Sequence, residues 1–160
     1  MGYSLGKRSL ERLEGVDERL ISVVKYAIAV SKQDFSVLEG LRDIKRQQQL
    51  VKSGASRTLK SKHLDGLAVD LGAFDSVTGI RWEEDLYYPI AEAMREGAEN
   101  AGVAICWGAA WAVEGNEYPY DCRKWRGSME EAREAYFKLR KSQNRKGFND
   151  MPHFELIADD

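Results

Sequence analysis

The spacing of apolar residues changes repeatedly along this chain, between the helical repeat and strict alternation, and this mixed pattern limits the possible folds most. The helical repeat predicts helices over residues 18–32, 44–52, 82–101 and 128–143. Alternation predicts short strands over residues 35–40, 67–71, 103–107 and 153–157. The sequence therefore predicts an α+β fold, in which a small, mainly antiparallel sheet is backed by the helices near 18–32 and 82–101.

The composition fits one globular domain. The chain has 160 residues, of which 43% are hydrophobic and 31% are charged, so we expect residues 1–160 to form a single domain with a core of its own. No stretch approaches the roughly 18 apolar residues that a membrane span needs. The net charge of −2 creates no overall field that would attract nucleic acid or an anionic membrane. We therefore expect neither membrane insertion nor a nucleic-acid partner.

The N-terminal residues lead directly into a charged amphipathic pattern and lack the apolar core of a signal peptide. This pattern predicts synthesis in a cytoplasm. The chain has two cysteines, Cys106 and Cys122, which could form one disulfide. Without a secretion signal, and with a core of full size, two reduced thiols are the favoured interpretation.

The two histidines of the chain each lie beside carboxylates at the mouth of a predicted strand. Gly66 permits a tight turn after His63, so that the next strand can bring Asp70 back toward the imidazole. With His153 as a third donor, two imidazoles and one carboxylate would leave a fourth tetrahedral position for water, as in a catalytic zinc site. The alternative is that these histidines are ordinary polar residues, and that Asp70 only accepts backbone hydrogen bonds.

Two motifs carry a family resemblance. Ser61-x-His63-x-x-Gly66-x-Ala68-x-Asp70 is followed far downstream by Asp150-x-x-His153-Phe154-Glu155. Together they resemble the family of zinc D-Ala-D-Ala carboxypeptidases and L-alanyl-D-glutamate endopeptidases, and within it the small single-domain phage endolysins. The likeness extends over most of the chain through Ser9-Leu-x-Arg-Leu-x-Gly-Val, Glu39-Gly-Leu-Arg42 with Gln47, Gly54-x-Ser56 and Trp107-Gly-x-x-Trp111.

The resemblance implies a zinc site formed by His63, Asp70 and His153, with Asp150 as the general base and acid. The family often has glutamate where this chain has Asp150. Glu155 is the alternative base, because it shares a strand face with His153; its other interpretation is a partner that orients a ligand. The resemblance also implies that Arg42 stabilises the oxyanion of the tetrahedral intermediate.

The remaining site predictions concern substrate contacts. Ser61 is expected to contact substrate or a ligand rather than to act as a nucleophile, because a metal removes the need for one. Gln47, which belongs to the resemblance, is also expected to contact substrate. Trp107 and Trp111 are expected either to line the substrate groove or to pack in the core, and the sequence favours neither.

The resemblance implies hydrolysis of bacterial peptidoglycan, most specifically at the L-alanyl-D-glutamate bond of the stem peptide, for release of phage from its host. A D,D-carboxypeptidase or dipeptidase that acts on terminal D-alanine would use the same metal site. A zinc-stabilised binding module without catalysis is the third hypothesis. We expect a monomer without a separate wall-binding domain, made in the host cytoplasm and acting on the wall after another protein permeabilises the membrane.

Overall fold

The computed structural model describes residues 2–56 and 61–158. Its centre is a five-stranded antiparallel sheet with the order β1-β2-β5-β4, and β3 pairs with β2 outside this path. The strands are β1 (Phe35–Glu39), β2 (Ala68–Asp75), β3 (Gly79–Arg81), β4 (Ile105–Trp107) and β5 (His153–Leu156). This arrangement confirms the predicted α+β fold with a small antiparallel sheet.

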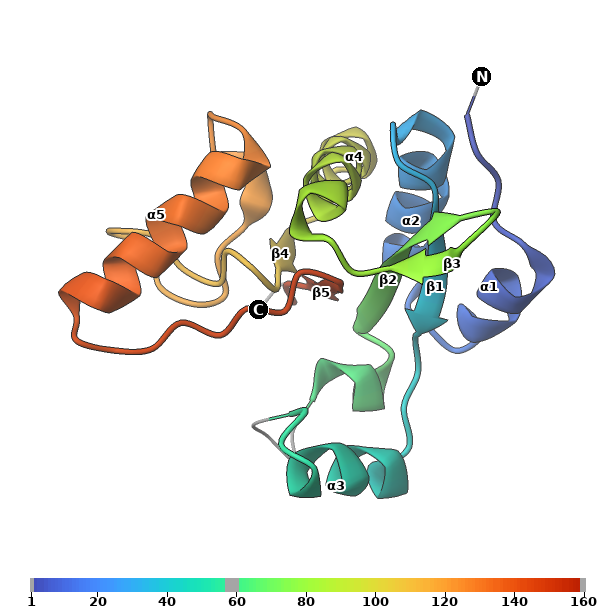
Figure 1. The fold of residues 1–160 in the computed structure, drawn as a ribbon, viewed down its shortest axis with the longest axis horizontal. Coiled ribbons are helices and arrows are strands. Elements are labelled where there is room, and N and C mark those ends of the chain that lie inside the picture. The colour runs from blue at the N-terminus through green and yellow to red at the C-terminus, as the bar shows by residue number, and fades with distance from the viewer. Residues whose placement is uncertain (1, 57–60, 159–160) are drawn as a thin grey trace.

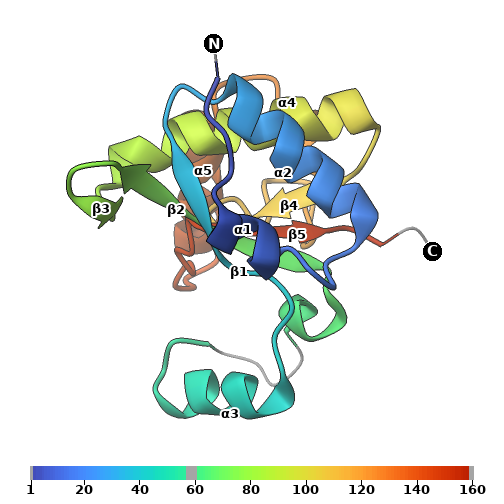
Figure 2. The same ribbon diagram turned by 90° about the vertical axis from the view of Figure 1, so that its right-hand side faces the viewer.

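The described residues also form five α-helices. They are α1 (Lys7–Arg12), α2 (Glu18–Val30), α3 (Ile44–Lys52), α4 (Tyr87–Ala101) and α5 (Met129–Ser142). Three short 3-10 helices are η1 (Lys62–Asp65), η2 (Glu84–Leu86) and η3 (Cys122–Lys124). Helices α2 and α4 pack against each other, and α3 lies at the opposite end of the molecule from both (Figures 1 and 2).

The helix predicted over residues 82–101 begins later than expected, at Tyr87. The reason is Pro89, which lacks an N–H group and whose ring would clash with the carbonyl four residues earlier in a continuous helix. Proline is accommodated in the first turn, so α4 begins just before it, and Glu84–Leu86 form the separate 3-10 helix η2. The helix α1 and the strand β3 were not predicted, because both are too short to show a clear repeat.

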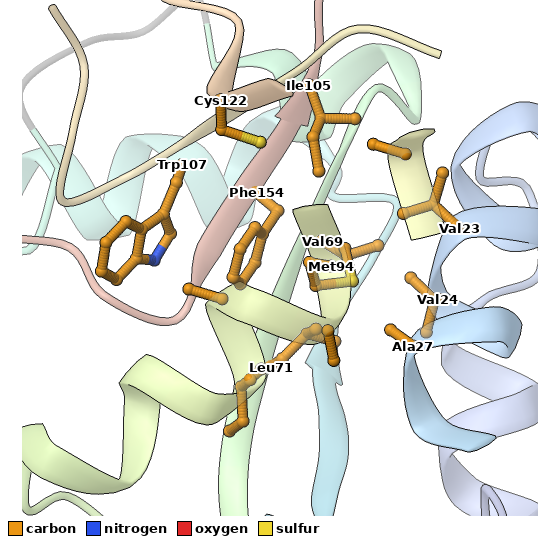
Figure 3. Packing of buried hydrophobic residues seen from close by; sticks show 14 of the residues in the cluster. Val23, Val24, Ala27, Val69, Leu71, Met94, Ile105, Trp107, Cys122 and Phe154 are labelled. Atoms are coloured by element: carbon orange, nitrogen blue, oxygen red, sulfur yellow. The ribbon is translucent and has the colours of Figure 1, made fainter. Parts of the chain in front are cut away.

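The main core lies between the sheet and the helices α2 and α4. Side chains from α2, α4 and β2 converge there, with Phe154 of β5 and Ile105 of β4 beside them (Figure 3). Val69 and Leu71 of β2 are fully buried on this side. Because side chains alternate along a strand, Asp70 between them points away from this core, as the sequence predicted.

Strand pairing brings distant parts of the chain into register. In the antiparallel β2–β5 pair, Asp70 lies opposite His153 and Val69 lies opposite Phe154. The residues opposite each other in such a pair are close neighbours on one face. The sheet therefore places two of the predicted metal ligands side by side, although 83 positions separate them in the sequence.

Two further sequence expectations concern the membrane and the cysteines. None of the helices in the described ranges combines the length and the apolar character that crossing a bilayer requires. Cys106 and Cys122 are buried free thiols. Burial raises the pKa of Cys122 to about 12, and burial likewise raises the pKa of Cys106, so neither forms a reactive thiolate at neutral pH.

Candidate metal centre

His63 is positioned by a short turn that leads into β2. The backbone N–H of His63 donates to Ser61 Oγ, 3.2 Å away, which caps the N-terminus of η1. The turn ends at Gly66, whose φ of +70° lies in the left-handed region. A Cβ atom at Gly66 would also lie 2.4 Å from the Gly15 carbonyl oxygen. Glycine is therefore required here for the chain to reverse and bring Asp70 back toward His63.

Three predicted ligands converge at this end of the sheet. Asp70 Oδ1 lies 3.2 Å from His63 Nε2 and 3.2 Å from His153 Nδ1. One potential ligand atom from each side chain lies within 4.8 Å of the others. His63 is 1% exposed and His153 is 7% exposed, so water competes little for these nitrogens. Two nitrogens and one carboxylate oxygen form a donor set that suits zinc.

In each imidazole, the ring nitrogen that does not face Asp70 already has a hydrogen-bond partner. His63 Nδ1 lies 2.8 Å from the Gly40 carbonyl oxygen, and His153 Nε2 lies 2.7 Å from Glu155 Oε1. A ring nitrogen that faces such an acceptor carries the proton. These contacts therefore leave His63 Nε2 and His153 Nδ1, the two nitrogens that face Asp70, for a metal ion.

Glu155 lies behind His153. Its side chain is buried, and its Oε2 accepts a hydrogen bond of 2.5 Å from the Tyr118 hydroxyl. Lys62 Nζ lies 3.3 Å from the same oxygen. Burial alone would raise the pKa of Glu155, but the hydrogen bond to His153 and the nearby charges lower it below its ordinary value. Glu155 is therefore an ionised carboxylate that orients His153.

The electrostatics of the three converging side chains favour a positive charge between them. Burial opposes ionisation of Asp70, yet its hydrogen bonds to His153 and His63 hold its pKa well below the usual range. Burial also opposes protonation of His153, but the hydrogen bonds to Asp70 and Glu155 raise its pKa to about 10. A bound cation would replace the proton that His153 carries in this arrangement.

Asp150 lies at the edge of the same centre, on the turn that precedes β5. Its Oδ2 atom is 3.9 Å from His153 Nδ1. Burial raises the pKa of Asp150 to about 6, with a further upward contribution from the charge of Asp70 and an opposing one from His153. A carboxyl whose pKa lies near neutrality can both accept and donate a proton at working pH.

Close backbone packing holds the turn that carries Asp150. The Asp150 N–H donates to the Gly108 carbonyl oxygen over 2.8 Å, and the Gly108 N–H donates to the His153 carbonyl oxygen over 2.7 Å. A Cβ atom at Gly108 would lie 2.1 Å from the Asp150 carbonyl oxygen. Only glycine therefore allows these two segments to approach so closely.

Trp107 supports this turn from within the core. Its Nε1 donates to the Met151 carbonyl oxygen over 2.8 Å, and its ring stacks on Phe154. Trp107 is fully buried and is not among the residues that line the cleft, so its predicted substrate contact does not match its position. The sequence left core packing open for this residue, and that is where the structure places it.

Arg42 also reaches the centre, through Asp70. Its Nε donates to Glu39 Oε1 over 2.5 Å, its Nη1 donates to Gln47 Oε1 over 2.7 Å, and its Nη2 lies 3.5 Å from Asp70 Oδ2. Ser61 Oγ lies 3.4 Å from Nη1. Arg42 and Ser61 both line the cleft. Gln47 is fully buried behind Arg42 and does not line the cleft, so its position fits support of Arg42 and not the predicted substrate contact.

The centre opens into a cleft of about 860 Å³, to which α3 and α5 both contribute side chains. Aromatic side chains form one wall: the Trp111 ring lies 5.3 Å from the His153 ring, 5.7 Å from that of Tyr118 and 6.1 Å from that of Phe148. Sequence reasoning proposed Trp111 but missed Tyr118 and Phe148, since neither belongs to a recognisable motif. A cleft of this volume accommodates a short peptide.

Comparisons with known proteins all find similarity to L-alanyl-D-glutamate peptidases. A profile of the phage L-alanyl-D-glutamate peptidase family matches residues 1–130. The L-alanyl-D-glutamate peptidase of Escherichia phage T5 is 27% identical over 121 residues, which cover 72% of this chain and 87% of that protein. The crystal structure of the L-Ala D-Glu endopeptidase ChiX from Serratia marcescens aligns with a TM-score of 0.67 and 33% identity, over 94% of this chain and 87% of that one.

Proposed function

Because this chain belongs to the family of phage L-alanyl-D-glutamate peptidases, we propose that it is a zinc-dependent endopeptidase that hydrolyses the bond between L-alanine and D-glutamate in peptidoglycan stem peptides. The observation that carries the proposal is the convergence of His63, Asp70 and His153 at the floor of a cleft that also contains Asp150. Family membership supports the substrate, and the donor set supports the metal.

The proposed metal ligands are His63 Nε2, Asp70 and His153 Nδ1. A zinc ion held by them would polarise the scissile carbonyl and make water a stronger acid. The protein's own contribution is orientation, since Gly40 and Glu155 fix the two imidazoles with their free nitrogens toward Asp70. Such partners typically raise metal affinity by about 10–100-fold.

In this proposal Asp150 takes a proton from the attacking water and then gives it to the leaving amine. Three features support this role: its carboxyl faces the centre, its Oδ2 lies 3.9 Å from His153 Nδ1, and its pKa is raised to about 6 mainly by burial. Glu155 is less suited, because its two oxygens already accept from His153 and Tyr118.

Arg42 is the proposed stabiliser of the oxyanion that forms when water attacks the carbonyl. Its guanidinium lines the cleft beside Asp70 and is held by Glu39 and Gln47. A fixed cation needs no reorganisation as negative charge develops, which makes it an effective stabiliser.

Replacing Arg42 by alanine is expected to lower kcat by about 10²–10³-fold and to leave one zinc per chain, since the lost charge acts on the developing oxyanion. Steady-state kinetics on a soluble stem peptide and metal analysis of the same preparation measure both quantities. Arg81→Ala is the control, because Arg81 is a partly exposed arginine that pairs with Glu83 and does not line the cleft. An unchanged kcat in the Arg42→Ala enzyme would remove this role.

Mass analysis of the products from purified peptidoglycan tests the proposed reaction. The proposal predicts fragments with a new amino terminus on D-glutamate and no release of free D-alanine. Release of D-alanine alone would replace the proposal with the D,D-carboxypeptidase, and absence of any product with zinc bound would indicate a binding module. A sample treated with a chelator provides the background.

We also propose that the protein acts as one domain and as a monomer, and that it acts in phage release. In that setting it is made in the host cytoplasm and reaches the wall after the membrane is permeabilised. Membership of a phage peptidase family supports this setting.

A further inference from the structure

A second group of charged side chains lines the same cleft, at the end of α5 and in the residues that follow it. Arg140, Arg145 and Lys146 contribute to this wall. We propose that Arg140, assisted by Arg145 and Lys146, binds the free carboxylate of the D-glutamyl residue of the substrate. This inference rests on the proposed function and names the part of the substrate that the cleft recognises.

Arg140 is an unusual arginine for this protein. It is only 7% exposed, yet no carboxylate of the described residues lies within ion-pair distance of it. Its guanidinium donates to Gln143 Oε1 over 2.9 Å and lies 5.2 Å from the centre of the Tyr136 ring. By contrast, Arg42 is paired with Glu39, and Arg95 with Glu92.

Burial of an unpaired guanidinium costs free energy, because the charge loses water without gaining a counter-charge. A simpler interpretation is that Arg140 stabilises the negative C-terminal end of α5. That role requires no burial, and the exposed neighbour Lys141 lies in the same last turn, where its charge can fill the role. The burial of Arg140 in the wall of a cleft therefore favours an anion that arrives with the substrate.

A chain of contacts connects Arg140 to the metal centre. The Tyr136 ring beneath its guanidinium carries a hydroxyl that accepts from the Phe148 N–H over 2.9 Å. The Phe148 carbonyl oxygen accepts from Trp111 Nε1 over 2.9 Å, and the Trp111 ring lies 5.3 Å from the His153 ring. The cations and the metal centre therefore belong to one continuous wall, along which a single peptide can reach both.

The chain turns back after α5 and places two more cations beside Arg140. Asn144 adopts a φ of +56°, and the Arg145 N–H then donates to the Arg140 carbonyl oxygen over 2.8 Å. Arg145 and Lys146 are exposed, and among the described residues neither has a carboxylate within ion-pair distance. Their charges add to the positive potential of this wall.

The chemistry of the substrate supplies the matching anion. Glutamate has two carboxyl groups, and a peptide chain continues through only one of them. An L-alanyl-D-glutamyl substrate therefore carries at least one free carboxylate next to the scissile bond, and this group is ionised at neutral pH. The planar guanidinium of arginine binds a carboxylate through two parallel hydrogen bonds, which suits it to this task.

The test compares two stem peptides that differ only in this group, one with the free D-glutamyl carboxylate and one with the carboxamide. We expect the wild-type zinc enzyme to prefer the acid by about 10–100-fold in kcat/KM, the range of one hydrogen-bonded charge pair. Arg140→Gln should bring the ratio close to one. The Arg145→Gln/Lys146→Gln double variant should reduce it by a smaller factor. Lys141→Gln, an exposed change in the same helical turn, should retain the wild-type ratio.

Thermal unfolding of each variant verifies that it is folded, and the double variant keeps the test valid if Arg140→Gln fails to fold. Equal cleavage of both peptides by the wild type, or an unchanged preference in the folded variants, would overturn the inference and leave the proposed function intact. If the wild type hydrolyses neither peptide, calorimetry on the Asp150→Asn protein can measure the binding of both. A preference for the acid in binding that disappears with Arg140→Gln then supports the inference, although the proposed function has failed.

Discussion

Replacing His153 with alanine is expected to abolish zinc binding and with it hydrolysis, to the background of the assay. His153 would supply one of three protein ligands, and its Nδ1 lies 3.2 Å from Asp70 Oδ1, the carboxylate on which the site converges. Two remaining ligands do not form the tetrahedral site of a catalytic zinc. His63→Ala and Asp70→Asn should have the same result. Metal analysis of dialysed protein and release of amino groups from peptidoglycan measure the two losses.

A carboxylate on the same strand provides the control for Asp70. Asp75 lies at the end of β2 and accepts the backbone N–H of Val77 over 2.8 Å. Asp75→Asn keeps an acceptor at that position and should retain one zinc per chain and full activity. If His63→Ala and His153→Ala each kept full zinc content and full lytic activity, the proposed centre would be abandoned.

Replacing Asp150 with asparagine should lower the hydrolysis rate by about 10²–10⁴-fold while zinc content and stability change little. The amide preserves the shape of the side chain but cannot accept a proton from water, and loss of general-base catalysis typically has this magnitude. Asp150 lies outside the three converging ligands, with its Oδ2 3.9 Å from His153 Nδ1, so metal binding does not depend on it. Single-turnover kinetics at saturating zinc measure the effect on chemistry.

Glu155→Gln provides the comparison, and we expect this change to affect zinc affinity and not the chemical step. Glu155 Oε1 lies 2.7 Å from His153 Nε2, so the change should weaken zinc affinity by about 10–100-fold through loss of the orienting charge. Activity should return when zinc is added in excess. If Glu155→Gln instead removed activity with zinc fully bound, and Asp150→Asn were nearly normal, the two roles would be reversed.

The acidic residues near His153 show the limit of sequence reasoning. Alternation along β5 correctly places Glu155 on the same face as His153, which made it a credible alternative to Asp150. The structure adds that Glu155 reaches the far nitrogen of the imidazole, whereas Asp150 lies nearer the nitrogen that faces Asp70. Periodicity assigns a face but not the nitrogen that a side chain reaches, because that depends on the rotation of the ring and on packing around it.

The tryptophans illustrate the same limit. Both belong to one short motif, and each is large and apolar with one polar N–H, so composition and spacing treat them alike. Only the structure separates Trp107, fully buried on Phe154, from Trp111 in the wall of the cleft. Gln47 is a similar case, since only the fold shows that it lies behind Arg42.

Features that depend on neighbours along the chain could be predicted from the residues alone. They are the alternation of helices and strands, the turn at Gly66, and the approach of His63 to Asp70 over seven positions. Features that depend on contacts between distant segments required the folded structure. The β2–β5 register sets Asp70 opposite His153, and the return of the chain after α5 brings Arg145 and Lys146 into the same cleft. A shift of one residue in that register would turn Asp70 and His153 to opposite faces, and the local pattern of residues contains no information on the register.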